Sequence, residues 1–147
     1  MRKLAAIALA LCLPSIAFAQ SGVWTGKVTG TGIGLLYGPK NGDPVFSLAC
    51  VKGTREVLAI AYGVKPTAID LLTLTFDAHQ FDFAVKPQAL KEGKMVQAAA
   101  KASPELLSAI RTAKDIRGAY GATRVGAYPA PPAALANTFA DRCGPLV

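Results

Sequence analysis

The sequence predicts an α+β fold, with a twisted antiparallel sheet or open β-barrel packed by one or two C-terminal helices. Two observations support this fold class. Short runs of alternating apolar residues, separated by turns rich in glycine and proline, fill most of the chain. Apolar residues at helical spacing occur only late in the chain. The chain is 52% hydrophobic, which provides a core and argues against disorder.

Four strands are expected in the first half. Residues 23–28 and 33–37 alternate in polarity and form the first two. Residues 41–44, Asn-Gly-Asp-Pro, predict a turn, because Asn and Gly accept the positive φ of tight hairpins. Residues 46–50 then place Phe, Leu and Cys on one inward face, and residues 57–62 are apolar enough for a central strand.

The clearest strands come next. Residues 71–76 and 80–86 both alternate and are joined by Asp77-Ala78, which indicates an antiparallel hairpin. Residues 95–100 are extended in pattern, but their alanines also permit a helix. A short hairpin is expected across residues 114–125.

Two helices complete the fold. Ser103-Pro104-Glu105 is typical of a helix start, with a side-chain cap, a proline in the first turn and an acid at the positive end. Its apolar stripe consists of Leu106, Leu107 and Ile110. The last helix is expected over residues 132–143 and ends at Gly144-Pro145. Its apolar face, expected to pack on the sheet, consists of Leu135, Phe139 and Cys143.

The first 19 residues predict a cleaved signal peptide. Arg2 and Lys3 precede an apolar run, and Ala17-Phe18-Ala19 forms a small-x-small cleavage site. The apolar run is about ten residues, too short for a membrane span, which needs about 20. We therefore expect one exported domain, residues 20–147, in the periplasm or outside the cell.

The remaining cysteines, Cys50 and Cys143, are expected to form a disulfide in that oxidising compartment. Such a bond would stabilise the fold by about 4–5 kcal/mol by the chain-entropy argument. A reactive thiol is the alternative. It is disfavoured because Cys143 lies at a helix C-terminus, where the dipole opposes a thiolate, and because Cys50 points inward.

The positive charge is concentrated in residues 86–124. The net charge is +7, and +5 without Arg2 and Lys3; this segment holds eight basic and three acidic residues. It predicts either a solvated face or a surface for an anionic envelope component or another envelope protein. The candidate anion-binding residues are Lys91, Lys94, Arg111, Lys114, Arg117 and Arg124.

Signs of catalysis are sparse. His79 is the only histidine, which excludes metal sites built on paired histidines, and no Gly-x-Ser-x-Gly motif occurs. His79 is expected to cap the hairpin turn, bonded to Asp77, although an acid–base role is the alternative. We expect no enzyme activity, no metal and no cofactor.

Two other patterns have simple structural explanations. Residues 30–34, Gly-Thr-Gly-Ile-Gly, lack the Gly-Lys-Ser/Thr of a phosphate loop and are expected in a hairpin. Trp24, Tyr37 and Tyr62 are expected to pack in the sheet, with a binding face as the alternative. Basic and aromatic residues are not interleaved, so no nucleic-acid partner is expected.

Several features together resemble small exported bacterial proteins of unknown function, and loosely the invasion-associated locus B family. They are Phe46-x-x-x-Cys50 after a turn, the helix with Leu106, Leu107 and Ile110, the following strand pair, and Tyr128-Pro129 followed by Leu135, Phe139 and Cys143. The resemblance implies an exported β-rich domain without a known active site. It assigns a role to no residue.

Three functions follow from these observations. The first is a non-enzymatic envelope protein that binds through its sheet face or its basic region. The second is a periplasmic inhibitor of a cell-wall hydrolase, similar to lysozyme inhibitors, although a +5 protein would be repelled by cationic lysozymes. The third is a hydrolase that uses His79.

Overall fold

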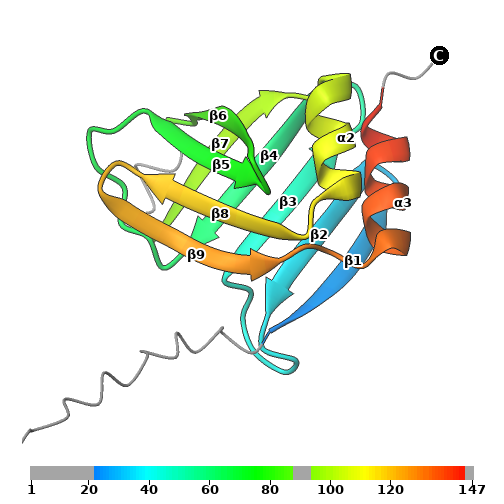
Figure 1. The fold of residues 1–147 in the computed structure, drawn as a ribbon, viewed down its shortest axis with the longest axis horizontal. Coiled ribbons are helices and arrows are strands. Elements are labelled where there is room, and N and C mark those ends of the chain that lie inside the picture. Colours follow the sequence, from blue (N-terminus) through cyan, green and yellow to red (C-terminus); the bar gives the residue numbers. More distant parts are fainter. Residues whose placement is uncertain (1–21, 88–93, 145–147) are drawn as a thin grey trace, which may run out of the picture.

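The computed structural model describes residues 22–87 and 94–144; the expected signal peptide, residues 1–19, lies outside these ranges. The described residues form one nine-stranded antiparallel sheet and two helices on its concave side (Figure 1). The strands are β1 (Val23–Thr29), β2 (Gly32–Gly38), β3 (Phe46–Val51), β4 (Glu56–Tyr62), β5 (Leu71–Phe76), β6 (His79–Val85), β7 (Met95–Lys101), β8 (Asp115–Tyr120) and β9 (Thr123–Pro129). The helices are α2 (Pro104–Thr112) and α3 (Ala133–Cys143). The predicted α+β class is confirmed.

The strand order across the sheet is β1-β2-β3-β4-β7-β6-β5-β8-β9. The run at residues 95–100, which permitted either helix or strand, is strand β7. It pairs with β4 along its whole length, from Glu56 opposite Lys101 to Tyr62 opposite Met95. The hairpin of β5 and β6 therefore lies between β7 and the late hairpin of β8 and β9.

The sheet curls into an open barrel, with β1 and β9 as its edges. At one end the two edges meet, because the indole N–H of Trp24 donates to the carbonyl oxygen of Pro129 at 2.7 Å. Elsewhere α3 lies over β2 and β3 (Figure 1). Gly26 of β1 leaves room for Leu135 of α3, since a Cβ at that glycine would lie 2.8 Å from the Leu135 Cδ2 atom. The helix thus covers the part of the barrel that β1 and β9 leave open.

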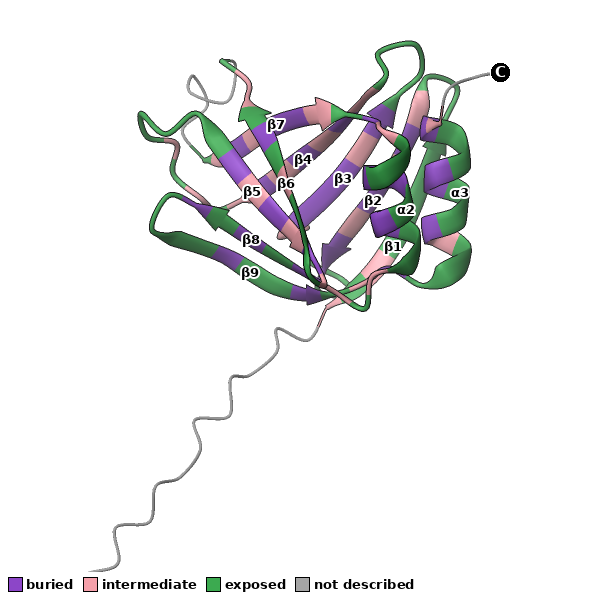
Figure 2. Cartoon of the chain, turned by 45° about the horizontal axis from the view of Figure 1, so that its top comes forward, coloured by how far each residue is buried: buried purple, intermediate pink, exposed green. Residues whose placement is uncertain are grey.

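The core lies between the concave face of the sheet and the two helices. Buried residues alternate with more exposed ones along β2, β4, β5 and β8, as expected for a sheet with one covered face, whereas β1 is exposed almost throughout and β3 is mostly buried (Figure 2). Four aromatic rings pack where the sheet edges meet. The rings of Phe46 and Tyr128 stack with centroids 4.9 Å apart, and Trp24 and Tyr37 are 5.2 Å apart. Residues from the first three strands and the last strand therefore share one cluster.

Helix α2 begins at the predicted residues, and α3 begins and ends within one residue of the predicted bounds. The Ser103 hydroxyl accepts the amide N–H of Leu106 at 3.2 Å, and Pro104 occupies the first turn of α2. The predicted apolar stripe is buried, with Leu106 fully covered and Ile110 1% exposed. Helix α3 follows Pro132 without a side-chain cap. None of the described helices is long and apolar enough to cross a bilayer.

Cys50 of β3 and Cys143 in the last turn of α3 lie at disulfide distance. Their Cα atoms are 5.7 Å apart and 93 positions separate them in sequence. Both are nearly buried, at 4% and 5% exposure. The bond fastens the last helix to the inner face of the third strand, as predicted.

Residues 30–34 form the turn between β1 and β2 and the start of β2, so the predicted hairpin is confirmed. The glycine at position 32 is required by close packing. A Cβ there would lie 2.1 Å from the carbonyl oxygen of Cys50 on β3.

Candidate anion-binding pocket

The predicted basic residues come from several parts of the fold. Lys91 lies outside the described residues, and Lys94 directly precedes β7, where its carbonyl accepts the amide N–H of Gly63. Arg111 of α2 forms an ion pair with Asp141 of α3. These contacts give Lys94 and Arg111 roles in the packing of neighbouring segments.

Lys114, Arg117 and Arg124 lie on or beside the β8–β9 hairpin. Arg124 is opposite Ala119, two residues from Arg117, so both arginines are on the solvent face. Asp115 offsets part of the positive charge of this hairpin, because its carboxylate lies 3.7 Å from the Arg117 Nε atom. The Arg117 guanidinium also donates to the main-chain carbonyl of Asp77 at 2.9 Å.

The prediction that His79 is bonded to Asp77 is wrong. The Asp77 carboxylate instead accepts the amide N–H groups of Lys114 and Asp115, at 2.9 and 3.1 Å. These two hydrogen bonds lower the pKa of Asp77 below its ordinary value. His79 is exposed at the start of β6. Asp77 therefore joins the β5–β6 turn to the start of β8, a structural role that the sequence pattern did not reveal.

A pocket of about 200 Å³ lies beside the Cys50–Cys143 pair. We call it the cationic pocket. Among the described residues that line it, three are basic and none is acidic. The lining residues are Cys50, Val51, Lys52, Gly53, Arg55, Arg142, Cys143 and Gly144.

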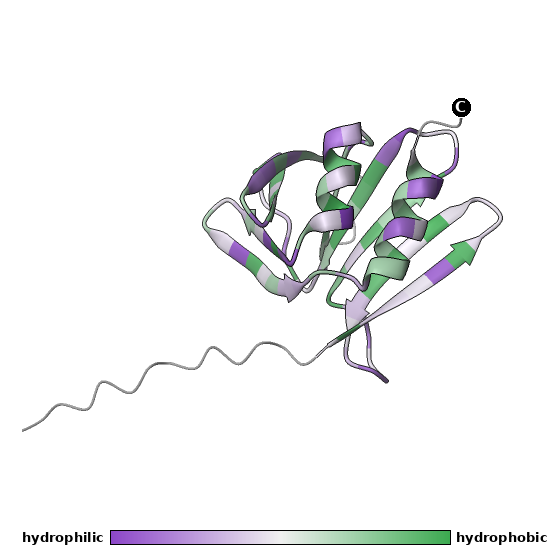
Figure 3. Ribbon diagram, turned by 45° about the vertical axis from the view of Figure 1, so that its right-hand side comes forward, coloured by the Kyte–Doolittle hydropathy of each residue, from purple (hydrophilic) through white to green (hydrophobic). Residues whose placement is uncertain are grey.

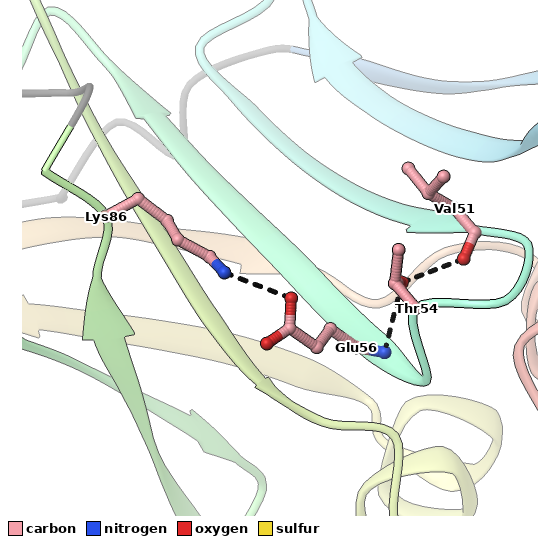
Figure 4. Close-up of polar contacts among 4 residues, drawn as sticks. All are labelled: Val51, Thr54, Glu56 and Lys86. Atoms are coloured by element: carbon pink, nitrogen blue, oxygen red, sulfur yellow. Dashed lines mark hydrogen bonds and ion pairs between the residues drawn. The ribbon is translucent and has the colours of Figure 1, made fainter.

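The β3–β4 turn holds Lys52 and Arg55 in place. The Thr54 hydroxyl donates to the Val51 carbonyl at 2.8 Å and accepts the amide N–H of Glu56 at 3.3 Å (Figure 4). The amide of Lys52 donates to the Thr31 carbonyl at 2.7 Å, which ties this turn to the β1–β2 turn. Hydrogen bonds within the β3–β4 turn and from this turn to the β1–β2 turn therefore fix the backbone on this side of the cationic pocket.

The nearest acid in sequence points elsewhere. The Glu56 carboxylate accepts from the Lys86 ammonium at 3.0 Å, and Figure 4 shows the two side chains directed at each other. The third cation, Arg142, lies in the last turn of α3, where a positive charge interacts favourably with the negative end of the helix dipole. The positive charge of Lys52, Arg55 and Arg142 is therefore not neutralised within the pocket lining.

The basic residues of this pocket escaped sequence reasoning because residues 20–85 contain equal numbers of basic and acidic side chains. A signal was nevertheless present. Lys52 is two residues from Cys50, and Arg142 is adjacent to Cys143. Pairing the two cysteines necessarily brings these cations together.

A second cavity, of about 300 Å³, lies on the outer face of β1–β4. We call it the apolar groove. Many of its lining residues hold outward strand positions, and the core residues Ile33, Leu48 and Cys50 also line it. The lining residues are Lys27, Thr29, Thr31, Gly32, Ile33, Gly34, Leu36, Ser47, Leu48, Ala49, Cys50, Val51, Ile60 and Tyr62.

The apolar groove reflects the composition of its strands. β3 and β4 carry apolar residues on both faces, and the strands behind the helices are mostly hydrophobic in Figure 3. Of the three aromatic residues noted in the sequence, Tyr37 is buried in the core, Trp24 packs beside it, and Tyr62 lines the groove. The Tyr62 and Ser47 hydroxyls lie 3.3 Å apart.

A third cavity, of about 380 Å³, lies where α2 and α3 meet. It contains Arg111 and Asp141, which pair with each other, so its charges are already balanced. No group of three or more His, Cys, Asp or Glu residues suited to a metal ion occurs in the described part of the chain.

Comparison of the chain with family models, curated proteins and solved structures finds no match. The resemblance to the invasion-associated locus B family stays a prediction.

Proposed function

We propose that this protein is a non-enzymatic binding protein of the bacterial envelope, periplasmic or secreted, that captures an anionic group in the cationic pocket. The observation that carries the proposal is the convergence of Lys52, Arg55 and Arg142 on one cavity whose described lining contains no acid. The Cys50–Cys143 pair supports an oxidising location.

The chemistry of the lining favours binding over catalysis. Guanidinium groups pair with carboxylates and phosphates through two parallel hydrogen bonds, and a lysine adds a mobile point charge. The described lining offers no carboxylate, imidazole or hydroxyl side chain that could act as a general base. We therefore expect an anion to bind without being chemically changed.

The three cations are exposed, so the binding energy should depend strongly on ionic strength. At about 0.1 M salt the Debye length is roughly 10 Å, which screens exposed charges beyond direct contact. A ligand carrying several negative charges should bind better than a monovalent one, because it contacts more than one cation at once.

Pyrophosphate is a suitable probe. We expect it to shift the amide NMR resonances of Lys52, Gly53 and Arg55, with an affinity that falls at least fivefold between 50 and 200 mM salt. The double variant R55Q/R142Q should lower the affinity at least tenfold. The matched control R117Q/R124Q removes the same charge from the β8–β9 hairpin. Its affinity for pyrophosphate should stay within twofold of the wild-type value.

Equal losses of pyrophosphate affinity in the two double variants would refute binding in the cationic pocket and favour a diffuse effect of net charge. Absence of any pyrophosphate binding at 50 mM salt would also overturn the proposal. A loss confined to R117Q/R124Q would move the site to the basic residues first indicated by the sequence.

A further inference from the structure

The apolar groove and the cationic pocket adjoin each other. Cys50 and Val51, at the end of β3, line both cavities. Val51 points to the outer face and is 47% exposed, so it lies at an open junction. Cys50 points inward, toward Cys143, so the three cations lie around the end of β3 from the apolar groove.

We infer that the two cavities form one site for an anionic amphiphile, with its charged head in the cationic pocket and a single alkyl chain in the apolar groove. This inference rests on the proposed function, because the same three cations hold the head. It adds the class of ligand, a single-chain alkyl phosphate or a chemically similar lipid.

The outer face of the sheet is divided into two unlike halves. In an antiparallel sheet with one covered face, outward positions are ordinarily polar. Most outward positions of β5 and β8 are polar, with Thr73, Thr75 and Arg117, although Leu71 at the start of β5 is apolar and exposed. The outward positions of β2 and β4 do not follow this rule, with Leu36 and Ile60. The apolar half is the one that ends at the cationic pocket.

Small residues create the depression within this apolar half. Gly34 and Ala49 are opposite each other on β2 and β3, and the neighbouring row across β2, β3 and β4 consists of Leu36, Ser47 and Ile60. A Cβ at Gly34 would lie 3.9 Å from its nearest neighbour, the Leu36 Cδ1 atom, so it would fit there at ordinary van der Waals distance. An alkyl chain would bury apolar surface here without any rearrangement of the backbone.

The size and charge of the combined site favour one small ligand over a second copy of this chain. Ligand sites range over about 300–1,000 Å³, and the two cavities together reach that range. A second copy packed on the same face would bring two sets of three uncompensated cations near each other, which is unfavourable.

The test compares dodecyl phosphate, ethyl phosphate and the neutral dodecyl maltoside by isothermal titration calorimetry, below their micellar concentrations. For the wild-type protein we expect dodecyl phosphate to bind at least tenfold more tightly than ethyl phosphate. Dodecyl maltoside should bind at least tenfold more weakly than dodecyl phosphate, because it lacks the anionic head.

The variant Gly34→Phe fills the apolar groove from a position where a side chain has room. It should remove the tenfold advantage of the dodecyl chain and leave ethyl phosphate binding unchanged. Ala127→Phe places the same ring on the exposed outer face of β9 and should keep the advantage. R55Q/R142Q should weaken both phosphates.

The outcomes separate this inference from the proposed function. If ethyl phosphate binds and R55Q/R142Q weakens it, but the dodecyl chain adds nothing or Gly34→Phe keeps its advantage, the amphiphile site is refuted and the anion pocket remains. If neither phosphate responds to R55Q/R142Q, both are refuted. Sedimentation showing a dimer that Gly34→Phe converts to a monomer would identify a second copy as the occupant and overturn the inference.

Discussion

The indole N–H of Trp24 donates to the carbonyl oxygen of Pro129, 105 residues later in the chain, at 2.7 Å. This hydrogen bond joins the two edge strands of the sheet at the place where the aromatic cluster forms. The rings of Tyr37 and Tyr128, one from each side of this junction, lie 5.1 Å apart. The junction therefore combines a polar contact between edges with ring packing beneath it.

Replacing Trp24 by Phe should lower the free energy of unfolding by about 1 kcal/mol, because it removes this hydrogen bond and keeps an aromatic ring. Trp24→Ala should cost about 2–4 kcal/mol, because the ring contacts with Tyr37 and Phe46 are lost as well. Urea unfolding followed by far-UV circular dichroism measures both. A Trp24→Phe protein as stable as the wild type would show that the bond adds nothing.

Gly32 and Gly30 form a matched pair in the β1–β2 turn region. Gly32→Ala should destabilise by at least about 2 kcal/mol, since its Cβ would overlap the Cys50 carbonyl oxygen of a neighbouring strand. Gly30→Ala should stay within about 0.5 kcal/mol of the wild type, because nothing lies within 4 Å of a Cβ there. Thermal unfolding of the two variants side by side is the measurement. Similar stabilities would contradict the close packing at Gly32.

Removing the Cys50–Cys143 bond should lower stability by about 4–5 kcal/mol, because it closes a loop of 93 residues in the unfolded chain. The double variant C50A/C143A provides the measurement, compared with oxidised wild type in urea. Wild-type protein treated with a reductant serves as the control for side-chain volume. A double variant that matches the oxidised protein would mean that the bond does not restrain the unfolded state.

Asp77 should make the free energy of unfolding depend on pH in the acidic range. Its pKa is lowered in the folded protein by the amides of Lys114 and Asp115. Its contribution is therefore present above the unfolded value of about 3.9 and is lost as the pH falls through the folded pKa.

Asp77→Asn tests this effect while retaining an oxygen acceptor and a residue that tolerates the positive φ of 54°. The difference in unfolding free energy between wild type and this variant should be largest near neutral pH and shrink below about pH 3.9. Asp43→Asn, in an exposed turn, controls for the change in net charge. A difference that is constant between pH 7 and pH 2 would refute the role of the carboxylate.

Much of the fold could be predicted because one face of most strands is buried. The alternation of Leu72, Leu74 and Phe76 and the cap at Ser103 are local signals, and both elements occur where expected. The information that makes β7 a strand is not local. Its alanine-rich sequence suits either helix or strand, and only pairing with β4 decides between them. The sheet order therefore depends on contacts that no single segment encodes.

The candidate site was harder to predict, for a related reason. Counting charge by segment pointed to residues 86–124, whereas the uncompensated cations of the pocket lie on both sides of that segment. Their convergence follows from the contact of β3 with α3. The apolar groove was hidden as well, because outward apolar residues such as Leu36 and Ile60 read as ordinary core positions in a sequence.

Helix α3 covers the open side of the barrel, and this has a consequence for how the molecule acquires its shape. The first strand and the third strand both depend on a segment made more than 80 residues later. Contacts this distant require large loops to close, which slows folding. A fragment ending before Ala133 would leave the inner surface beside Gly26 and Cys50 exposed to solvent. Such a fragment should therefore form a partly folded, aggregation-prone species and not a smaller native domain.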